Sequence, residues 1–253
     1  MYWKKVLIAV AFIGVFFSVE HYSSTVAAAD AEAQAVSGVG ETVPETETIF
    51  EGKATGPIMA DGGRGLFRDL SFTLEAGSSV AITGPSGCGK TSLLNVLGLL
   101  QPADQGELFW AGQRLDAHSD QQRLRFWREV AAFIYQDYGV IDEASVAYNV
   151  TLDRRQTHDF KVKEILKAVG LTGREKRQAV TLSGGEKQRL GLARALYKEA
   201  KIIFADEPTA SLDRYNRQQV FELLRHCQDQ GALVVLATHD ENLAKHCDQQ
   251  ICL

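Results

Sequence analysis

Cysteine is scarce in this sequence, and its spacing excludes several kinds of site. Only four cysteines occur among 253 residues, and no two of them form a C-x-x-C pair. The pattern therefore predicts no zinc ribbon or finger, and so few cysteines do not make the disulfide framework of a small secreted domain. We expect reduced thiols in a domain that folds around an ordinary hydrophobic core.

A long apolar segment is also missing. The most apolar stretch, residues 6–19, has fourteen residues without a charge, whereas a membrane-spanning helix needs about 20. Lys4 and Lys5 precede this stretch, and small residues follow it near Ala27–Ala29. A basic start, a short apolar run and an Ala-x-Ala site are typical of a secretory signal peptide. We therefore expect residues 1–29 to be a signal-like or membrane-associated segment.

An excess of either charge is missing from most of the chain. The net charge is −5, but residues 30–51 contain six acidic residues and no lysine or arginine, so the remainder is close to neutral. Without a basic patch, the sequence gives no support for nucleic-acid binding. The acidic stretch is also rich in Ala, Gly and Thr, which predicts a flexible linker over residues 30–48.

From residue 49 to residue 253, the pattern predicts one α/β domain without internal repeats. Three apolar runs are typical of strands that are buried on both faces of a parallel sheet: residues 79–83, 202–205 and 233–237. An antiparallel region is expected near residues 70–74 and 107–110. Helices are predicted over residues 92–100 and 216–230, and from residue 120 onward. In this last helix, we expect Leu124, Trp127 and Ala131 to form the apolar face.

A glycine-rich segment follows the first apolar strand. Its sequence, GPSGCGKT, fits the pattern G-x-x-x-x-G-K-[ST] between a predicted strand and a predicted helix. The glycines let successive backbone N–H groups point at phosphate oxygens, and the helix N-terminus favours an anion. The lysine suits the β- and γ-phosphates, and the threonine suits Mg²⁺. A chance glycine loop is the alternative. The predicted phosphate-binding residues are Gly84, Pro85, Ser86, Gly87, Cys88, Gly89, Lys90, Thr91 and Ser92.

Two adjacent acids end another predicted strand. Asp206 and Glu207 follow the apolar run Ile202–Ala205, and sheets of this kind bind ligands at the carboxyl ends of their strands. Asp206 is suited to hold Mg²⁺ together with Thr91, and Glu207 is suited to polarise an attacking water as a general base. Two solvated acids at a strand end are the alternative, which the phosphate loop upstream makes weaker.

The segment TLSGGEKQRLGLARAL combines a helix start with two adjacent glycines. Ser183 and Glu186 have the spacing of a capping box. Yet a glycine inside a helix costs roughly 1 kcal/mol relative to alanine, so a cap alone does not explain Gly184 and Gly185. We expect the bare backbone at this helix N-terminus to meet an anion.

Four segments occur together in a characteristic order: GPSGCGKT, LSGGEKQR, IIFADEPTASLD and ATHD. With them, the chain from about Leu66 to Leu253 resembles the ATPases of ATP-binding-cassette (ABC) transporters. The resemblance implies a P-loop NTPase core with a parallel sheet, an antiparallel β region, and a helical subdomain at about residues 142–182 that delivers LSGGE. It also implies Mg²⁺-dependent hydrolysis of ATP coupled to transport.

The resemblance assigns roles to further residues. In the family, the LSGGE segment, here Ser183 to Glu186, binds the γ-phosphate of ATP on the other subunit, which implies a head-to-tail dimer with two sandwiched ATP molecules. Gln136 matches a glutamine that meets Mg²⁺ or water and senses the permease. Asp213 matches a loop that touches the other subunit, and His239 matches a histidine that contacts the γ-phosphate. A polar strand end for Gln136 and a structural histidine for His239 are the alternatives.

Three further segments are similar to ATPases of the macrolide-exporter and lipoprotein-releasing group and of small bacteriocin exporters: GLLQPADQGELFWAGQRL, YQDYGVIDEASVAYNV and DENLAKHCDQQI. In that group the resemblance implies an integral-membrane permease on a separate chain. One alternative is a non-transport ABC ATPase, although the coiled-coil insertion or tandem cassettes of that class are missing here. The other is a regulatory ABC protein with impaired catalysis.

Two features depart from the family. The aromatic residue that stacks on adenine is missing from the segment GPIMADGGRG, Phe50 lies too far upstream to be assigned, and the family's first strands are hard to place in residues 49–65. The signal-like start also conflicts with ATP chemistry in the cytosol. We expect the cassette at the cytoplasmic face of the cell membrane, with the first 29 residues along the membrane or the permease, or absent from the native product.

Overall fold

The structure, a computed structural model, describes residues 48–53, 58–59, 65–67, 70–102 and 106–253. The expected signal-like segment and all of the expected linker except Thr48 lie outside these ranges. Most of the segment in which the adenine-stacking residue was sought, residues 56–65, also lies outside them.

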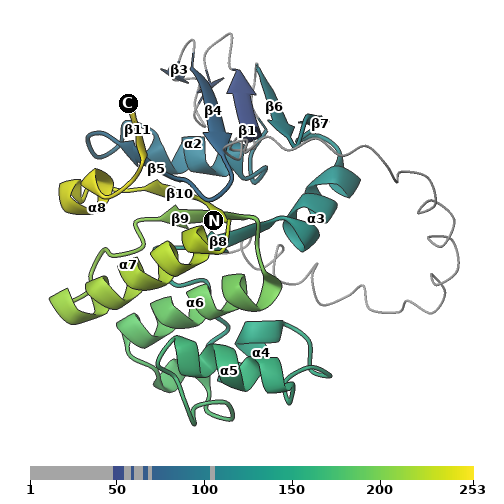
Figure 1. Cartoon of the computed structure of the whole chain (residues 1–253), viewed down its shortest axis with the longest axis vertical. Coiled ribbons are helices and arrows are strands. Elements are labelled where there is room, and N and C mark those ends of the chain that lie inside the picture. The colour runs from purple at the N-terminus through teal and green to yellow at the C-terminus, as the bar shows by residue number, and fades with distance from the viewer. Residues whose placement is uncertain (1–47, 54–57, 60–64, 68–69, 103–105) are drawn as a thin grey trace, which may run out of the picture. The chain divides into compact units, whose positions relative to one another are not determined.

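Five parallel strands form the central sheet, in the order β11-β5-β10-β9-β8 (Figure 1). They are β5 (Ser79–Thr83), β8 (Ala131–Ile134), β9 (Ile202–Asp206), β10 (Leu233–Ala237) and β11 (Gln249–Cys252). The first four residues of β5, β9 and β10 are all buried, as expected for strands that are covered on both faces. The parallel pairing confirms the predicted α/β fold class and brings the carboxyl ends of these strands to one edge.

An antiparallel sheet has the order β4-β1-β6-β7. Its strands are β1 (Thr48–Lys53), β4 (Ser71–Glu75), β6 (Glu107–Trp110) and β7 (Gln113–Leu115), and a separate pair is formed by β2 (Ile58–Met59) and β3 (Gly65–Phe67). Strand β1 lies where the family's first strands were hard to place from the sequence. Phe50 on this strand is fully buried, with its ring centre 6.0 Å from that of Phe72 and 6.3 Å from that of Phe204. Phe50 is therefore a core residue and not a base-stacking one.

Helices cover both faces of the parallel sheet (Figure 1). On one face, α2 (Lys90–Leu97) and α3 (Asp120–Glu129) share a hydrophobic core with the antiparallel sheet. On the other face, α6 (Gly184–Lys198), α7 (Arg214–Asp229) and α8 (Glu241–Lys245) pack on a second core. The carboxyl edge of the sheet therefore lies between two helical layers.

A third core lies among the helices alone. It joins α6 to α4 (Val146–Thr151), α5 (Phe160–Ala168) and the short 3-10 helix η1 (Ala179–Thr181). Leu190 and Ala193 of α6 belong to this third core, whereas Leu192 and Ala195 belong to the second. Helix α6 is therefore held from both sides, and its N-terminus is fixed relative to the sheet.

The buried face of α3 differs from the predicted one. Leu124 is 46% exposed, and Ala131 lies in β8 because the helix ends at Glu129. The buried side chain is Phe126, whose ring centre lies 6.5 Å from those of two other aromatic rings, Trp110 and Phe204. The prediction is confirmed for Trp127, which packs against the first core. It was wrong for Leu124, and it placed Ala131 in the helix because it continued a helical period across a helix–strand boundary.

Candidate active site

The predicted phosphate loop connects β5 to α2. Gly89 is the N-cap of α2 and has φ 107°, a left-handed conformation that glycine adopts without strain. A Cβ atom on Gly84 would lie 2.7 Å from Sγ of Cys88 and 2.9 Å from the carbonyl oxygen of Leu253. Both positions therefore require glycine, and the loop reaches α2 without a capping side chain over its first N–H groups.

The charge of this loop is held against its backbone. Lys90 is 8% exposed, and its Nζ atom donates hydrogen bonds to the carbonyl oxygens of Gly84, at 2.9 Å, and Pro85, at 3.1 Å. The ammonium group thus lies inside the curve of the loop, where a phosphate group is expected. Of the other predicted loop residues, Pro85, Ser86, Gly87 and Thr91 are exposed, and Cys88, Gly89 and Ser92 are half-buried.

Thr91 and Asp206 meet, although 115 positions separate them in the sequence. The Thr91 hydroxyl donates a hydrogen bond of 3.1 Å to Oδ1 of Asp206. Burial raises the pKa of the Asp206 carboxyl, and the negative charge of Glu207 adds to this, while the hydrogen bond from Thr91 and the charge of Lys90 lower it. A carboxylate that is partly removed from water beside a hydroxyl is a pair of oxygen ligands suited to a hard cation.

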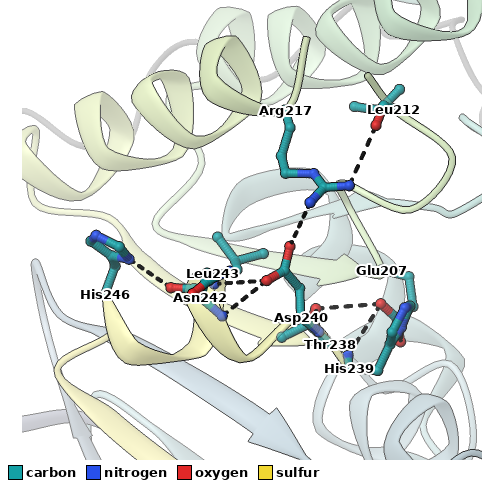
Figure 2. A network of polar contacts seen from close by, with 9 residues as sticks. All are labelled: Glu207, Leu212, Arg217, Thr238, His239, Asp240, Asn242, Leu243 and His246. Carbon is teal, nitrogen blue, oxygen red and sulfur yellow. Dashed lines mark hydrogen bonds and ion pairs between the residues drawn. The ribbon is translucent and has the colours of Figure 1, made fainter. Parts of the chain in front are cut away.

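The side chains of Glu207 and His239 meet at the same edge of the sheet. The Oε1 atom of Glu207 lies 2.8 Å from Nδ1 of His239, and the Glu207 side chain is only 13% exposed (Figure 2). Glu207 has φ 46°, which is uncommon for a residue other than glycine. Its backbone N–H donates to the carbonyl oxygen of Ala237 at 2.8 Å, so the end of β10 holds this conformation.

Gln136 lies two residues after the end of β8, next to the end of β9. Its side chain is exposed. The next residue, Asp137, was not predicted, yet its charge contributes to raising the pKa of Asp206. A carboxylate besides the acid pair therefore acts on the predicted cation site, and its position directly after Gln136 is the signal that the sequence offered.

The N-terminus of α6 has the predicted capping box. The Ser183 hydroxyl accepts from the Glu186 backbone N–H at 3.3 Å, and Oε2 of Glu186 accepts from the Ser183 N–H at 2.8 Å. This second bond is the main cause that lowers the pKa of Glu186, and Arg174, at 3.3 Å from its Oε1 atom, contributes to the same effect. Both carboxylate oxygens of Glu186 thus have partners within its own chain.

Gly184 and Gly185 have a role that the sequence did not predict. A Cβ atom on Gly184 would lie 2.5 Å from the phenolic oxygen of Tyr138, and one on Gly185 would overlap the side chain of Asn216. The bare backbone therefore makes room for two side chains of the same subunit. This packing is independent of any anion that the helix N-terminus meets.

Asn216 also binds the predicted residue Asp213, the N-cap of α7. Oδ1 of Asp213 accepts from the Asn216 backbone N–H at 2.8 Å, and Oδ2 accepts from the Asn216 amide at 2.7 Å. The first of these bonds lowers the pKa of Asp213 most. Asn216 in turn accepts from Arg189 of α6, whose Nε atom donates to the carbonyl oxygen of Val169 at 2.9 Å. Asp213 is thereby connected to the glycine-containing helix.

The predicted site residues form two groups within one subunit. The phosphate loop, the acid pair, Gln136 and His239 gather at the carboxyl edge of the parallel sheet. The capped N-terminus of α6 and Asp213 form the other group. Within the described ranges, no hydrogen bond or ion pair joins residues 183–186 to the phosphate loop, the acid pair or His239.

The parallel sheet, the phosphate loop between β5 and α2, and the acidic pair after β9 define an α/β P-loop nucleotide triphosphatase. Residues 67–210 match the sequence profile of the family described as ABC transporter. The chain belongs to this family, as an ATP-hydrolysing cassette.

Two relatives and one solved structure give the extent of the similarity. The chain is 38% identical over 187 residues to a lipoprotein-releasing system ATP-binding protein of Francisella tularensis, with 71% of this chain and 81% of the relative covered. It is 36% identical over 192 residues to the macrolide export ATP-binding/permease protein MacB of Escherichia coli, with 74% of this chain covered but 30% of that protein. The cassette MJ0796, solved as a dimer in a post-hydrolysis state with ADP and phosphate, matches with a TM-score of 0.72 and 27% identity, over 81% of this chain and 94% of that one.

Among the helices of the described ranges, none combines the length and the apolar character that crossing a bilayer requires.

Proposed function

We propose that this chain is the ATP-hydrolysing subunit of an exporter, that it works as a head-to-tail dimer, and that it drives a permease on a separate chain. The family supplies the ATPase activity and its coupling to transport.

The separation of the two groups of site residues carries this proposal. Within the described ranges, the exposed residue Ser183 and the N-cap residue Asp213 form no hydrogen bond with the phosphate loop of their own subunit. A helix N-terminus is suited to bind an anion, and a two-fold arrangement lets one subunit provide it to the phosphate loop of the other. The dimeric state of the solved cassette with ADP and phosphate supports this arrangement.

The chain's own residues fit ATP with Mg²⁺. Among the residues that the structure describes, no cluster of three His, Cys, Asp or Glu side chains forms a metal cage. Mg²⁺ rarely needs one, because it is usually bound by one or two carboxylates together with substrate phosphates and water. Thr91 and Asp206 are suited to hold it, with Gln136 at the neighbouring strand end, and its charge would stabilise the phosphate oxygens.

The catalytic roles follow from the carboxyl edge of the sheet. Lys90 would bind the phosphates, and Glu207 would orient and deprotonate the attacking water. His239, which is 66% exposed and paired with Glu207, would contact the γ-phosphate and keep the carboxylate in place. Asp206 is already turned toward Thr91, which leaves Glu207 as the acid of this pair for the water.

The relatives favour an export system, with the cassette at the cytoplasmic face of the membrane. The lipoprotein-releasing protein is an ATP-binding chain of similar length, and the macrolide protein joins cassette and permease in one longer chain. A permease on a separate chain is the arrangement that we infer here.

The test is ATP turnover by the full chain and by Glu207→Gln. We expect the substitution to reduce phosphate release by about 10²- to 10⁴-fold, the usual contribution of a general base, while binding of a fluorescent ATP analogue stays unchanged. With hydrolysis blocked, the variant should accumulate as an ATP-dependent dimer in gel filtration.

Glu129→Gln is the matched control, because Glu129 is an exposed carboxylate whose partner is Arg125 on the surface of α3. This control should turn over ATP like the unmodified chain. Near-normal turnover by Glu207→Gln would remove Glu207 as the base, and hydrolysis by a monomer at nanomolar dilution would contradict the shared site.

A further inference from the structure

Thr238, between β10 and α8, is a polar side chain with no exposure to solvent. Its hydroxyl donates to Oε2 of Glu207 at 3.3 Å and accepts from the Asp240 backbone N–H at 3.0 Å (Figure 2). With no exposed surface in this structure, the Thr238 hydroxyl is placed to act on the reaction through Glu207.

The two carboxylate oxygens of Asp240 have different partners. Oδ1 caps α8 by accepting from the backbone N–H groups of Asn242, at 2.9 Å, and Leu243, at 3.3 Å. Oδ2 lies 3.3 Å from Nη1 of Arg217, and this carboxylate is only 15% exposed. The start of α8 and the first turn of α7 are thereby fixed to each other.

Arg217 extends the network to residues 212–213, directly before α7. Its Nη2 atom donates to the carbonyl oxygen of Leu212 at 3.5 Å, and Leu212 directly precedes Asp213 (Figure 2). A continuous set of contacts therefore runs from the N-terminus of α7, through Arg217, Asp240 and Thr238, to the Glu207 carboxylate.

Glu207 needs such support. Its backbone is in the left-handed region, and its side chain has two oxygens that must be aimed at different targets. His239 engages Oε1 through its ring, whereas Oε2 receives the Thr238 hydroxyl and, at 3.4 Å, the His239 backbone N–H. Without Thr238, Oε2 keeps only the longer of its two hydrogen bonds.

We propose that Thr238 and Asp240, braced by Arg217, are positioning residues that hold the Glu207 carboxylate in its catalytic orientation. The inference rests on the proposed role of Glu207 as the base. It adds that the orientation of the Glu207 carboxylate depends on a contact with α7. This contact lies next to the loop of Asp213, which we expect to touch the other subunit.

The first test is Thr238→Val, which keeps the shape and removes the hydroxyl. A hydrogen bond to a charged group is worth enough to predict a fall in kcat of about 10- to 100-fold. The KM for ATP should change by less than about twofold, because ground-state binding of the nucleotide is not touched. Thr238→Ser, which restores the hydroxyl, should recover most of kcat.

Thr151→Val is the matched control. Like Thr238, the Thr151 hydroxyl both donates and accepts: it donates to the carbonyl oxygens of Asp153, at 2.8 Å, and Ala147, at 3.5 Å, and accepts from the Asp153 backbone N–H at 3.1 Å. It lies at the end of α4, away from the sheet edge. We expect this control to lower thermal stability by a similar amount and to leave kcat unchanged.

Arg217→Gln and Asp240→Asn test the outer part of the network. Asparagine keeps an oxygen that can cap α8 and loses the charge toward Arg217. Each single variant should lower kcat by about two- to fivefold, the size of the effect of a partly exposed ion pair. The kcat of the double variant should be no lower than that of the less active single variant, because both substitutions break the same contact.

Crystal structures of the wild-type chain and Thr238→Val give a readout that does not depend on turnover. We expect the Glu207 carboxylate to leave its position in the variant and to keep it in Thr238→Ser. An unchanged position of the Glu207 carboxylate in Thr238→Val would overturn this inference. Equal kcat values of the wild type and Thr238→Val would also overturn it. If Glu207→Gln is inactive in the same assay, the proposed function still stands. A wild-type chain without ATP turnover would instead refute the proposed function, and the crystal structures would still decide the inference.

Discussion

At the scale of single residues, two glycines of the same helix should respond oppositely to alanine. A Cβ atom at Gly185 overlaps the side chain of Asn216, which Asp213 and Arg189 already hold. Because Asn216 cannot move without losing these bonds, we expect Gly185→Ala to lower the free energy of unfolding by about 1–3 kcal/mol, the usual cost of overpacking. Chemical denaturation of the two chains measures this difference.

Gly191, two turns further along α6, is the matched control. A Cβ atom there would meet only the Tyr138 carbonyl oxygen at 3.5 Å, an ordinary contact. Gly191→Ala should therefore be neutral or stabilising, by up to about 1 kcal/mol from helix propensity. Equal effects of the two substitutions would show that the side chain of Asn216 yields easily, and would contradict the packing role assigned to Gly185.

The residues of the candidate site were predictable to very different degrees. Lys90, Asp206 and Glu207 belong to short motifs whose spacing reflects local geometry. The sequence was therefore sufficient to place Lys90 at the start of α2 and the two acids at the end of β9. Thr238 and Asn216 instead contact residues that are distant in the sequence. Thr238 and Glu207, for example, are 31 positions apart. Contacts of this kind follow from the packing of α7 and β10, which no local pattern expresses.

At the scale of secondary-structure elements, Lys198 fastens the end of α6 to α3 and β8. Its Nζ atom donates to the carbonyl oxygens of Trp127 and Ala131, and burial lowers its pKa to about 8. The folded state therefore releases this proton at a lower pH than the unfolded state does. Between about pH 8 and pH 10, the unfolded chain binds more protons at this site, so its contribution to stability rises with pH.

Lys198→Met removes this titration while it keeps most of the side-chain volume. The difference in unfolding free energy between the two chains should shift in favour of the wild type by on the order of 1–3 kcal/mol from pH 8 to pH 10. Denaturant titrations at several pH values measure it, and the difference cancels buried groups that titrate in both chains, such as Cys227. A difference that does not vary with pH would contradict the buried position of the ammonium group.

The strands and helices show why part of the fold could not be predicted. The parallel strands are short, continuous apolar runs, because both of their faces are covered, and all three expected runs form strands. Strand β1 lacks a clear sequence signal because it contains Gly52, which is a poor strand former, and overlaps the end of an acidic tract. Gly52 is required there since a Cβ atom would overlap the ring of Phe72 on the paired strand β4.

At the scale of the whole molecule, the shared site predicts complementation between two inactive variants. Lys90→Ala removes the charge of the phosphate loop. Ser183→Asp keeps a good N-cap for α6 but places a negative charge where the phosphate of the other subunit is expected. Each variant alone should have almost no turnover. An equal mixture with free subunit exchange should recover about a quarter of the wild-type rate, since half of the dimers contain one intact site.

Circular dichroism and binding of a fluorescent ATP analogue provide the controls for this experiment. Ser183→Asp should fold and bind nucleotide like the wild type, because its phosphate loop is intact. Recovery is expected to rise with incubation time as subunits exchange. No recovery from two well-folded variants would contradict the head-to-tail dimer, and full activity of Ser183→Asp alone would remove Ser183 from the site.

The first turn of α7 constrains the length of the chain after Asp213. Asn216 and Arg217 are neighbours, yet the first contacts Arg189 of α6 and the second contacts Asp240 at the start of α8. A substitution at either position breaks one of these connections and spares the other. One residue added or removed after Asp213 would rotate both side chains by about 100° around the helix axis and break both connections together. The length of this segment should therefore tolerate change less than its composition does.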